Sequence, residues 1–290
     1  MEAREFLYRL SLVRGIGLVT KGAIWTAAQD SQRYDDLAVL ASEVGLNMDH
    51  TADLIANFYG NELDQQLAVN AKVPSICLLD DEYPEQLKEI AHPPLVLYYQ
   101  GDINLLKKRS LAVVGARKQI QYGRMASDLL LPEIVNQGYP IVSGLAKGMD
   151  TIAHQFTLEN NGKPIGVIGT GLDKVYPAEN QKLQRLVAEK GVLITEYPLG
   201  SAPLPYHFPE RNRIIAGLCT ACLVLMAKEK SGSLITANLA LQENRNVLAV
   251  PGLVTMSYSA GCNQLIAAGA RSALSSNDIL EELATPIAEK

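Results

Sequence analysis

This chain of 290 residues has few of the features that mark membrane or disulfide-rich proteins. No apolar run is long enough to span a bilayer, and the N-terminal MEAREFLYRL lacks the hydrophobic core of a signal peptide. Only four cysteines occur, which excludes a small disulfide scaffold. We therefore expect a cytoplasmic protein with reduced thiols and no membrane partner.

Motifs of common catalytic and cofactor sites are also missing. The sequence contains no G-x-S-x-G elbow for a serine nucleophile and no G-x-G-x-x-G dinucleotide loop. Cys219 and Cys222 have C-x-x-C spacing, but they lie in the apolar run LCTACLVLMA with no second pair, which favours buried thiols over a zinc or redox site. We expect no catalytic residues, no metal ion and no cofactor.

The charge is unevenly divided along the chain. The formal net charge is −5. Residues 1–106 hold 7 Lys/Arg against 16 Asp/Glu, a net of −9, whereas residues 107–290 hold 19 against 15, a net of +4. Such asymmetry indicates that one part binds a polyanion, although random surface charge on two domains explains it equally well.

Hydrophobic spacing divides the chain into three stretches. Residues 1–70 repeat apolar residues every three or four positions, which predicts a small all-helical domain. Within it, LVRGIGLVTKGAIW resembles the turn of a helix-hairpin-helix or SAM-like domain, and a plain helix–helix turn is the alternative. Residues 71–106 form a connector whose LVLYYQG predicts a strand that joins the main sheet.

Residues 107–290 alternate strand-like and helix-like segments. Short apolar runs occur at 110–115, 139–144, 164–170, 191–197, 221–227 and 246–252, separated by helix-length segments. Such alternation predicts an α/β fold with a doubly wound, mostly parallel sheet, in which ligands bind at the carboxyl ends of the strands.

Cations and small residues follow several of these predicted strands. Arg117 and Lys118 follow the first strand, Lys147 follows Ser143 and Gly144 at the end of the second, and Lys230 precedes Ser231, Gly232 and Ser233 before a helix. Unpaired N–H groups at a helix N-terminus attract anions, so this edge of the sheet is expected to bind phosphates. Taken singly, each of these turns is also explained as ordinary helix capping.

The segment YHFPERNRIIAGL adds aromatic and basic residues. It is expected to form a loop in which Phe208 stacks on bases while Arg211, Asn212 and Arg213 contact phosphates, the combination typical of single-strand binders. The alternative is that Phe208 belongs to the core and the arginines pair with Glu210 or Glu196.

Taken together, the motifs resemble one family. VVGARK, IVSGLAKGMDTIAH, VIGTGLDKVYPAEN, FPERNRIIAGL, SGSLITA and SAGCNQLIAAGA occur in the order and spacing of the DNA-processing protein A family (DprA, also called Smf). The resemblance covers about residues 75–275, and the helical N-terminal part is similar to the SAM-like domain of some members.

The resemblance implies an extended Rossmann-like domain over 107–290 that binds single-stranded DNA without being an enzyme. Its expected role is to protect incoming strands in natural transformation and recombination and to help load RecA, acting as a homodimer. The positions carried over from the family as DNA-binding are Arg117, Ser143, Gly144, Lys147, Phe208, Arg211, Asn212, Arg213, Ser231, Gly232 and Ser233, to which the strand-end pattern adds Lys118 and Lys230.

The chain departs from the family pattern at a few points. Ala116 stands where the family often has serine, and Met226 stands where glutamate is common. We expect no C-terminal winged-helix domain, since the chain ends in DILEELATPIAEK. Asp150 is interpreted as a capping or turn residue and His154 as a packed one.

One enzymatic alternative has the same general topology. A nucleotide-processing Rossmann enzyme of the LOG phosphoribohydrolase type would carry a P-G-G-x-G-T-x-x-E loop, and VPGLVTMSYSAG does not match it.

Overall fold

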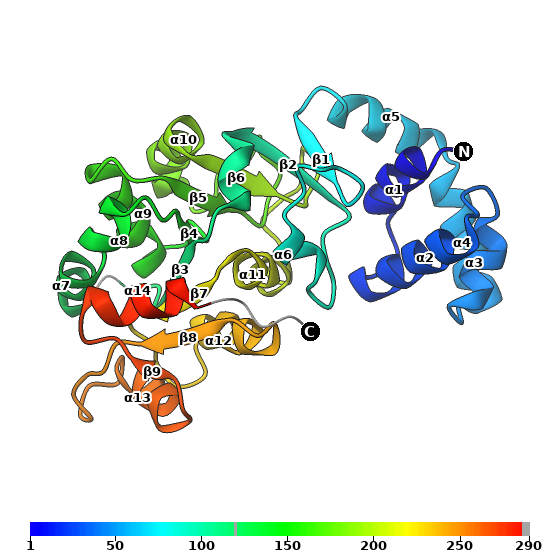
Figure 1. Cartoon of the computed structure of the whole chain (residues 1–290). Helices are drawn as coiled ribbons and strands as arrows, with labels where there is room; N and C mark the ends of the chain where they lie inside the picture. The colour runs from blue at the N-terminus through cyan, green and yellow to red at the C-terminus, as the bar shows by residue number, and fades with distance from the viewer. Residues whose placement is uncertain (119–120, 286–290) are drawn as a thin grey trace.

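The computed structural model describes residues 1–118 and 121–285 and is built around one twisted sheet (Figure 1). Within these residues the sheet has nine strands in the order β1-β2-β6-β5-β4-β3-β7-β8-β9. The pairs β1–β2 and β2–β6 are antiparallel and the other neighbours are parallel. The strands are β1 (Ser75–Cys77), β2 (Val96–Gly101), β3 (Leu111–Val114), β4 (Ile141–Ser143), β5 (Pro164–Val167), β6 (Val192–Thr195), β7 (Ala221–Val224), β8 (Asn246–Ala249) and β9 (Arg271–Ser272). The predicted α/β class with a mostly parallel sheet is confirmed.

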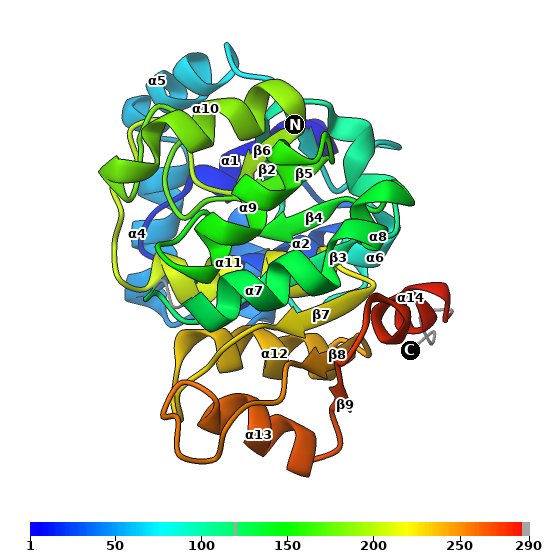
Figure 2. The same cartoon turned by 90° about the vertical axis from the view of Figure 1, so that its left-hand side faces the viewer.

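Helices cover both faces of the sheet (Figure 1 and Figure 2). One face carries α7 (Gln121–Leu130), α8 (Pro132–Asn136), α9 (Met149–Glu159), α10 (Gln181–Lys190) and α14 (Ser276–Ala284). The other carries α6 (Glu85–Lys88), α11 (His207–Leu218), α12 (Gly232–Gln242) and α13 (Ala260–Ala267).

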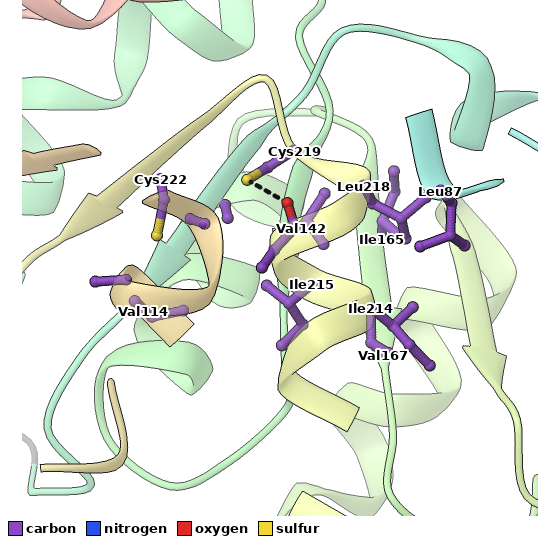
Figure 3. Close-up of a cluster of buried hydrophobic side chains, with 14 of the residues drawn as sticks. Leu87, Val114, Val142, Ile165, Val167, Ile214, Ile215, Leu218, Cys219 and Cys222 are labelled. Atoms are coloured by element: carbon purple, nitrogen blue, oxygen red, sulfur yellow. Dashed lines mark hydrogen bonds between the residues drawn. The ribbon is translucent and has the colours of Figure 1, made fainter. Parts of the chain in front are cut away.

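Alternation along the central strands builds the two apolar layers. In β3, Ala112 and Val114 face α11 and its neighbours, whereas Leu111 and Val113 face α7 and α9. All four side chains are buried, because successive residues of a strand point to opposite faces and both faces are covered. Figure 3 shows the first layer, in which Ile214 and Ile215 of α11 pack over the central strands.

The N-terminal part consists of helices. They are α1 (Ala3–Leu12), α2 (Leu18–Ser31), α3 (Leu37–Glu43), α4 (Met48–Phe58) and α5 (Asn61–Asn70). Their core residues form one apolar cluster with Val96 and Tyr98 of β2. The helices therefore lie against the β2 side of the sheet rather than apart from it (Figure 1).

Two details differ from the sequence-based expectations. Strands β1 and β9, of three and two residues, carry too little pattern to be recognised before folding. The segment expected as a loop around Phe208 is the start of α11, so that expectation was wrong. No helix within residues 1–118 and 121–285 combines the length and apolar character that a membrane-spanning segment needs.

Candidate nucleic-acid interface

A cavity of about 580 Å³ lies at the carboxyl ends of β3 and β7. We call it the strand-end cavity. Its walls come from the β3–α7 turn, the β7–α12 connection and the first turns of α9, α11 and α12. Its polar and charged lining residues are Arg117, Lys118, Asp150, Arg211, Asn212, Lys228, Glu229, Lys230, Ser231, Ser233, Thr236 and Tyr258.

The β3–α7 turn presents Arg117 and Lys118, which are both exposed. Its backbone is anchored: Ala116 donates to the Met226 carbonyl at 2.8 Å and accepts from the Met149 amide at 3.0 Å. Gly115 lies so close to Met149 that an added Cβ would be 2.6 Å from its Cγ. Gly115 and Ala116 are thus held against the end of β7 and the start of α9, and the exposed side chains of Arg117 and Lys118 follow directly after them.

The N-terminus of α12 forms the opposite wall. Ser231 occupies the cap position, yet within the described part of the chain its side chain caps no backbone N–H; its Oγ lies 2.8 Å from Ser233 Oγ. Lys230 precedes it with a left-handed φ of 56°. Open N–H groups and the positive end of the helix dipole therefore face the cavity beside an exposed ammonium, which suits a phosphate.

Arg211 is buried in the floor of the cavity and has only 4% of its surface exposed. Its Nη1 donates to the Gly144 carbonyl at 2.6 Å and to the Val167 carbonyl. Burial lowers the pKa of the guanidinium, and the nearby Asp150 carboxylate opposes this shift. Arg211 therefore joins the ends of β4 and β5 instead of extending toward solvent.

Asp150 shapes the loop between β4 and α9. Its Oδ2 accepts from the Gly144 amide at 3.2 Å and from the Ala146 amide at 3.4 Å, as a turn residue does. Burial raises the pKa of this carboxyl, and Arg211 counteracts the rise. The Asp150–Arg211 combination thereby holds the loop that carries Lys147.

A smaller cavity of about 120 Å³ adjoins the first and shares Arg117, Phe208 and Arg211 with it. Phe208 is partly exposed and packs against Tyr176, with ring centroids 5.1 Å apart. Lys147 lines the smaller cavity and pairs with Glu179 at 2.6 Å, both side chains being about half exposed. An exposed pair of this kind is weak, so a phosphate can replace the carboxylate.

Two of the expected residues lie elsewhere. Ser143 is fully buried and donates to the Val113 carbonyl at 2.7 Å. Arg213 is buried and pairs with Glu196. Since residues two apart on a helix face opposite sides, α11 cannot direct both Arg211 and Arg213 into one cavity. Gly144 lines only the smaller cavity, and Gly232 lines the larger.

Among the lining residues that were not singled out from the sequence are one cation, Lys228, and two aromatic residues, Tyr176 and Tyr258. Lys228 lies in KEKSGS beside Lys230, and its Nζ is 4.5 Å from the ring centroid of Tyr258. Tyr176 follows β5 in the motif GTGLDKVYP. All three residues follow predicted strands, and this location was the signal by which the sequence could have revealed them. Tyr258, which follows β8, reaches the cavity because β8 lies next to β7.

The chain is similar to known proteins over most of its length. Residues 75–284 match the family model described as DNA recombination-mediator protein A. The chain is 46% identical over 211 residues to DNA processing protein DprA of Streptococcus pneumoniae, covering 73% of this chain and 74% of that protein. It is 43% identical over 212 residues to DprA of Bacillus subtilis, with 73% and 71% covered.

Solved structures agree with this similarity. The X-ray structure of DprA from Streptococcus pneumoniae matches with a TM-score of 0.91 and 37% identity, covering 99% of both chains. DprA from Helicobacter pylori, a protein with a single-stranded DNA binding mode, matches with a TM-score of 0.66 and 28% identity over 74% of this chain and 97% of that one. The resemblance read from the sequence motifs is therefore confirmed, and the chain belongs to the DNA recombination-mediator protein A family.

Proposed function

We propose that this protein binds single-stranded DNA at the strand-end cavity, protects incoming strands in natural transformation and recombination, and helps to load RecA. The observation that carries the proposal is the convergence of exposed cations from two separate strand ends on one cavity: Arg117 and Lys118 after β3, Lys228 and Lys230 after β7. The single-stranded DNA binding of the Helicobacter pylori relative supports the same assignment.

In this proposal the two walls bind the backbone of the strand. Phosphates lie between Arg117 and the open N-terminus of α12, where charge-assisted hydrogen bonds to guanidinium, ammonium and N–H groups are strong. A base stacks on the partly exposed ring of Phe208. Because these contacts read the backbone and the face of any base, binding is expected to be independent of sequence.

The proposed role is binding in the cytoplasm without catalysis. Asp150 already accepts two backbone N–H groups. His154 has no exposed surface. Neither group is placed to activate a nucleophile, which leaves no observation that favours the phosphoribohydrolase alternative. Dimerisation and contact with RecA are parts of the proposal that rest on family membership.

Binding of a labelled oligothymidine, followed by fluorescence anisotropy, tests the proposal. Arg117→Ala and Lys230→Ala should each weaken binding about tenfold and reduce the slope of log K against log[salt] by about 0.7, because each removes one phosphate contact. Phe208→Ala should weaken the binding free energy by roughly 1–3 kcal/mol and change the slope of log K against log[salt] little. Oligoadenosine should behave like oligothymidine, and a blunt duplex should compete poorly.

The matched control is Lys163→Ala. Lys163 is an exposed lysine just before β5, at the opposite edge of the sheet. Its loss should leave binding unchanged. Equal weakening by Lys163→Ala and Lys230→Ala would show that binding follows net charge alone, and the cavity assignment would be rejected.

A further inference from the structure

A second, larger cavity of about 880 Å³ lies between the N-terminal helices and the sheet. We call it the helix–sheet cleft. Its walls are the α1–α2 turn, α5, the segment before β2 and the connection from β6 to α11. Its volume is within the range of small-molecule sites, which often form where two structural units meet.

One end of the cleft attracts anions. The helix α2, 14 residues long, begins after Gly17, and within residues 1–118 and 121–285 no side chain caps that start. Its first turn contains no acidic residue. Lys21 extends into the cleft and donates to the Ser11 carbonyl at 2.7 Å. Open N–H groups beside an ammonium are what a phosphate requires.

Arg14 adds a second cation at this end. It pairs with Glu62 at 2.9 Å, but the two side chains are 71% and 73% exposed. An ion pair so exposed contributes little stability, so Arg14 can turn to an incoming anion at small cost. The Gly15-Ile16-Gly17 turn, which does not line the strand-end cavity, lines this cleft beside Arg14.

Two carboxylates, Glu196 and Glu210, also line the cleft and lie within electrostatic reach of Lys21. Glu196 has only 8% of its side chain exposed, and its Oε2 accepts from Arg213. Its Oε1 is buried and has no hydrogen-bond partner among the described residues. A buried acceptor without a partner is unfavourable, so a ligand whose N–H donor meets Oε1 when the side chain turns toward the cleft would gain affinity there. Glu210 lies beside it and accepts from the Tyr197 hydroxyl at 2.8 Å.

Aromatic residues close to these carboxylates in the sequence line the cleft too. Tyr197 stacks on His207 with centroids 3.8 Å apart, and Tyr206 contacts His207 edge-on at 4.6 Å. Tyr206 lines the cleft and is 58% exposed. Its ring is therefore available for a planar ligand to stack on.

We propose that the helix–sheet cleft binds a guanine nucleotide. The phosphate lies at the start of α2 with Lys21 and Arg14, and the base stacks on Tyr206 with its donor edge toward Glu196 and Glu210. Guanine presents two adjacent donors, N1–H and the exocyclic amino group, that suit carboxylate oxygens. Adenine and cytosine place a ring-nitrogen acceptor beside their amino group, and a carboxylate repels that acceptor.

Isothermal titration calorimetry of the full chain with guanosine monophosphate tests this site. Guanosine monophosphate should bind at least tenfold more tightly than adenosine monophosphate, guanosine or inorganic phosphate. Lys21→Met should weaken the binding of guanosine monophosphate at least tenfold, because the phosphate loses its ammonium partner. Glu196→Gln should reduce the preference for guanine over adenine, since an amide can both donate and accept.

Two control variants locate the binding. Lys72→Met removes an exposed lysine that lies just after α5 and outside the cleft, and it should leave nucleotide affinity unchanged. Lys230→Ala removes a cation of the strand-end cavity and should also leave it unchanged. Thermal melts check that each variant is folded.

Three outcomes would overturn the proposal. These are no heat from guanosine monophosphate at millimolar concentration, equal affinity for adenosine monophosphate, and loss of binding in Lys230→Ala. If Glu196→Gln does not fold, the comparison of nucleotides on the unaltered protein and the Lys21→Met result still decide.

Discussion

At the residue scale, the role of each cation depends on its burial. Arg211 and Lys230 look alike in the sequence, since each lies in a basic motif that was expected to bind DNA. Arg211 is 4% exposed and bonded to two carbonyl groups, whereas Lys230 is exposed at the cavity rim. Arg211 therefore organises the site from below, and Lys230 is the residue of the two that can exchange water for phosphate.

A pH-dependent stability follows from His154, a fully buried residue of α9. Burial lowers the pKa of His154 to about 4. In the unfolded chain the imidazole titrates near 6.5, so the unfolded state binds the extra proton first as the pH falls. The neutral imidazole of His154 therefore contributes fully to the free energy of unfolding above pH 6.5. This contribution, roughly 3 kcal/mol, is lost as the pH falls from 6.5 to about 4.

Urea unfolding between pH 4 and pH 7.5 measures this effect. Compared with a His154→Gln variant, the natural protein should lose stability more steeply in that window. Other groups titrate equally in both proteins and cancel in the difference. Parallel curves for the two proteins would contradict the assignment.

At the element scale, α11 lies between the two cavities. Phe208, Arg211 and Asn212 line the strand-end cavity, whereas His207 and Glu210 line the helix–sheet cleft. A loop with the same sequence would have no fixed relation between these side chains. The helical period separates them onto two faces.

The approach of two loops at Gly148 gives a prediction at this scale. Gly148 has φ +82°, and a Cβ there would overlap the main-chain atoms of Ala116 and Arg117. Gly148→Ala should therefore lower the free energy of unfolding by roughly 2–5 kcal/mol, from backbone strain and overpacking together. It should also weaken oligothymidine binding, because the backbone that carries Arg117 has to move.

Gly138→Ala is the matched control. Gly138 also has φ +82°, but no atom lies within 4 Å of its added Cβ. It should cost only the strain of a left-handed residue, about 1–2 kcal/mol, and leave DNA binding intact. Urea unfolding and anisotropy measure both variants; equal losses of stability in the two would show that the contact at Ala116 is unimportant.

At the scale of the whole molecule, the N-terminal helices and the sheet share a core. Phe6, Leu10 and Trp25 belong to the same apolar cluster as Val96 and Tyr98 of β2. Polar contacts cross the same boundary: the Asn70 side chain accepts from the Leu199 amide at 2.8 Å, and the Tyr8 hydroxyl lies 2.9 Å from Ser75 Oγ. The two parts are therefore expected to unfold together.

The single tryptophan makes this expectation measurable. Trp25 lies in α2 and is 4% exposed, so its fluorescence reports on the packing around the N-terminal helices. Far-ultraviolet circular dichroism reports on the entire chain. The two urea transitions should have the same midpoint, as required for two-state unfolding. A fluorescence transition at lower urea would mean that the helices unfold independently.

Much of the site was predictable because its signals are local. Arg117, Lys118, Lys230 and the Ser231–Ser233 turn all follow apolar runs, and parallel strands bring their carboxyl ends to one edge. Lys228 and Tyr176 follow the same rule and could have been found by applying it more strictly. The buried position of Ser143 could not be predicted in this way, because its hydroxyl donates a hydrogen bond to a carbonyl of the neighbouring strand.

The amino-acid order by itself determined the class of fold, the helical character of residues 3–70 and the family, since each depends on patterns that are contiguous along the chain. Only the tertiary structure decided which cations reach solvent, that α11 lines two different cavities, and that a cleft opens between the helices and the sheet. Exposure and cavity shape depend on contacts between residues far apart in sequence, and these contacts exist only once the chain has packed.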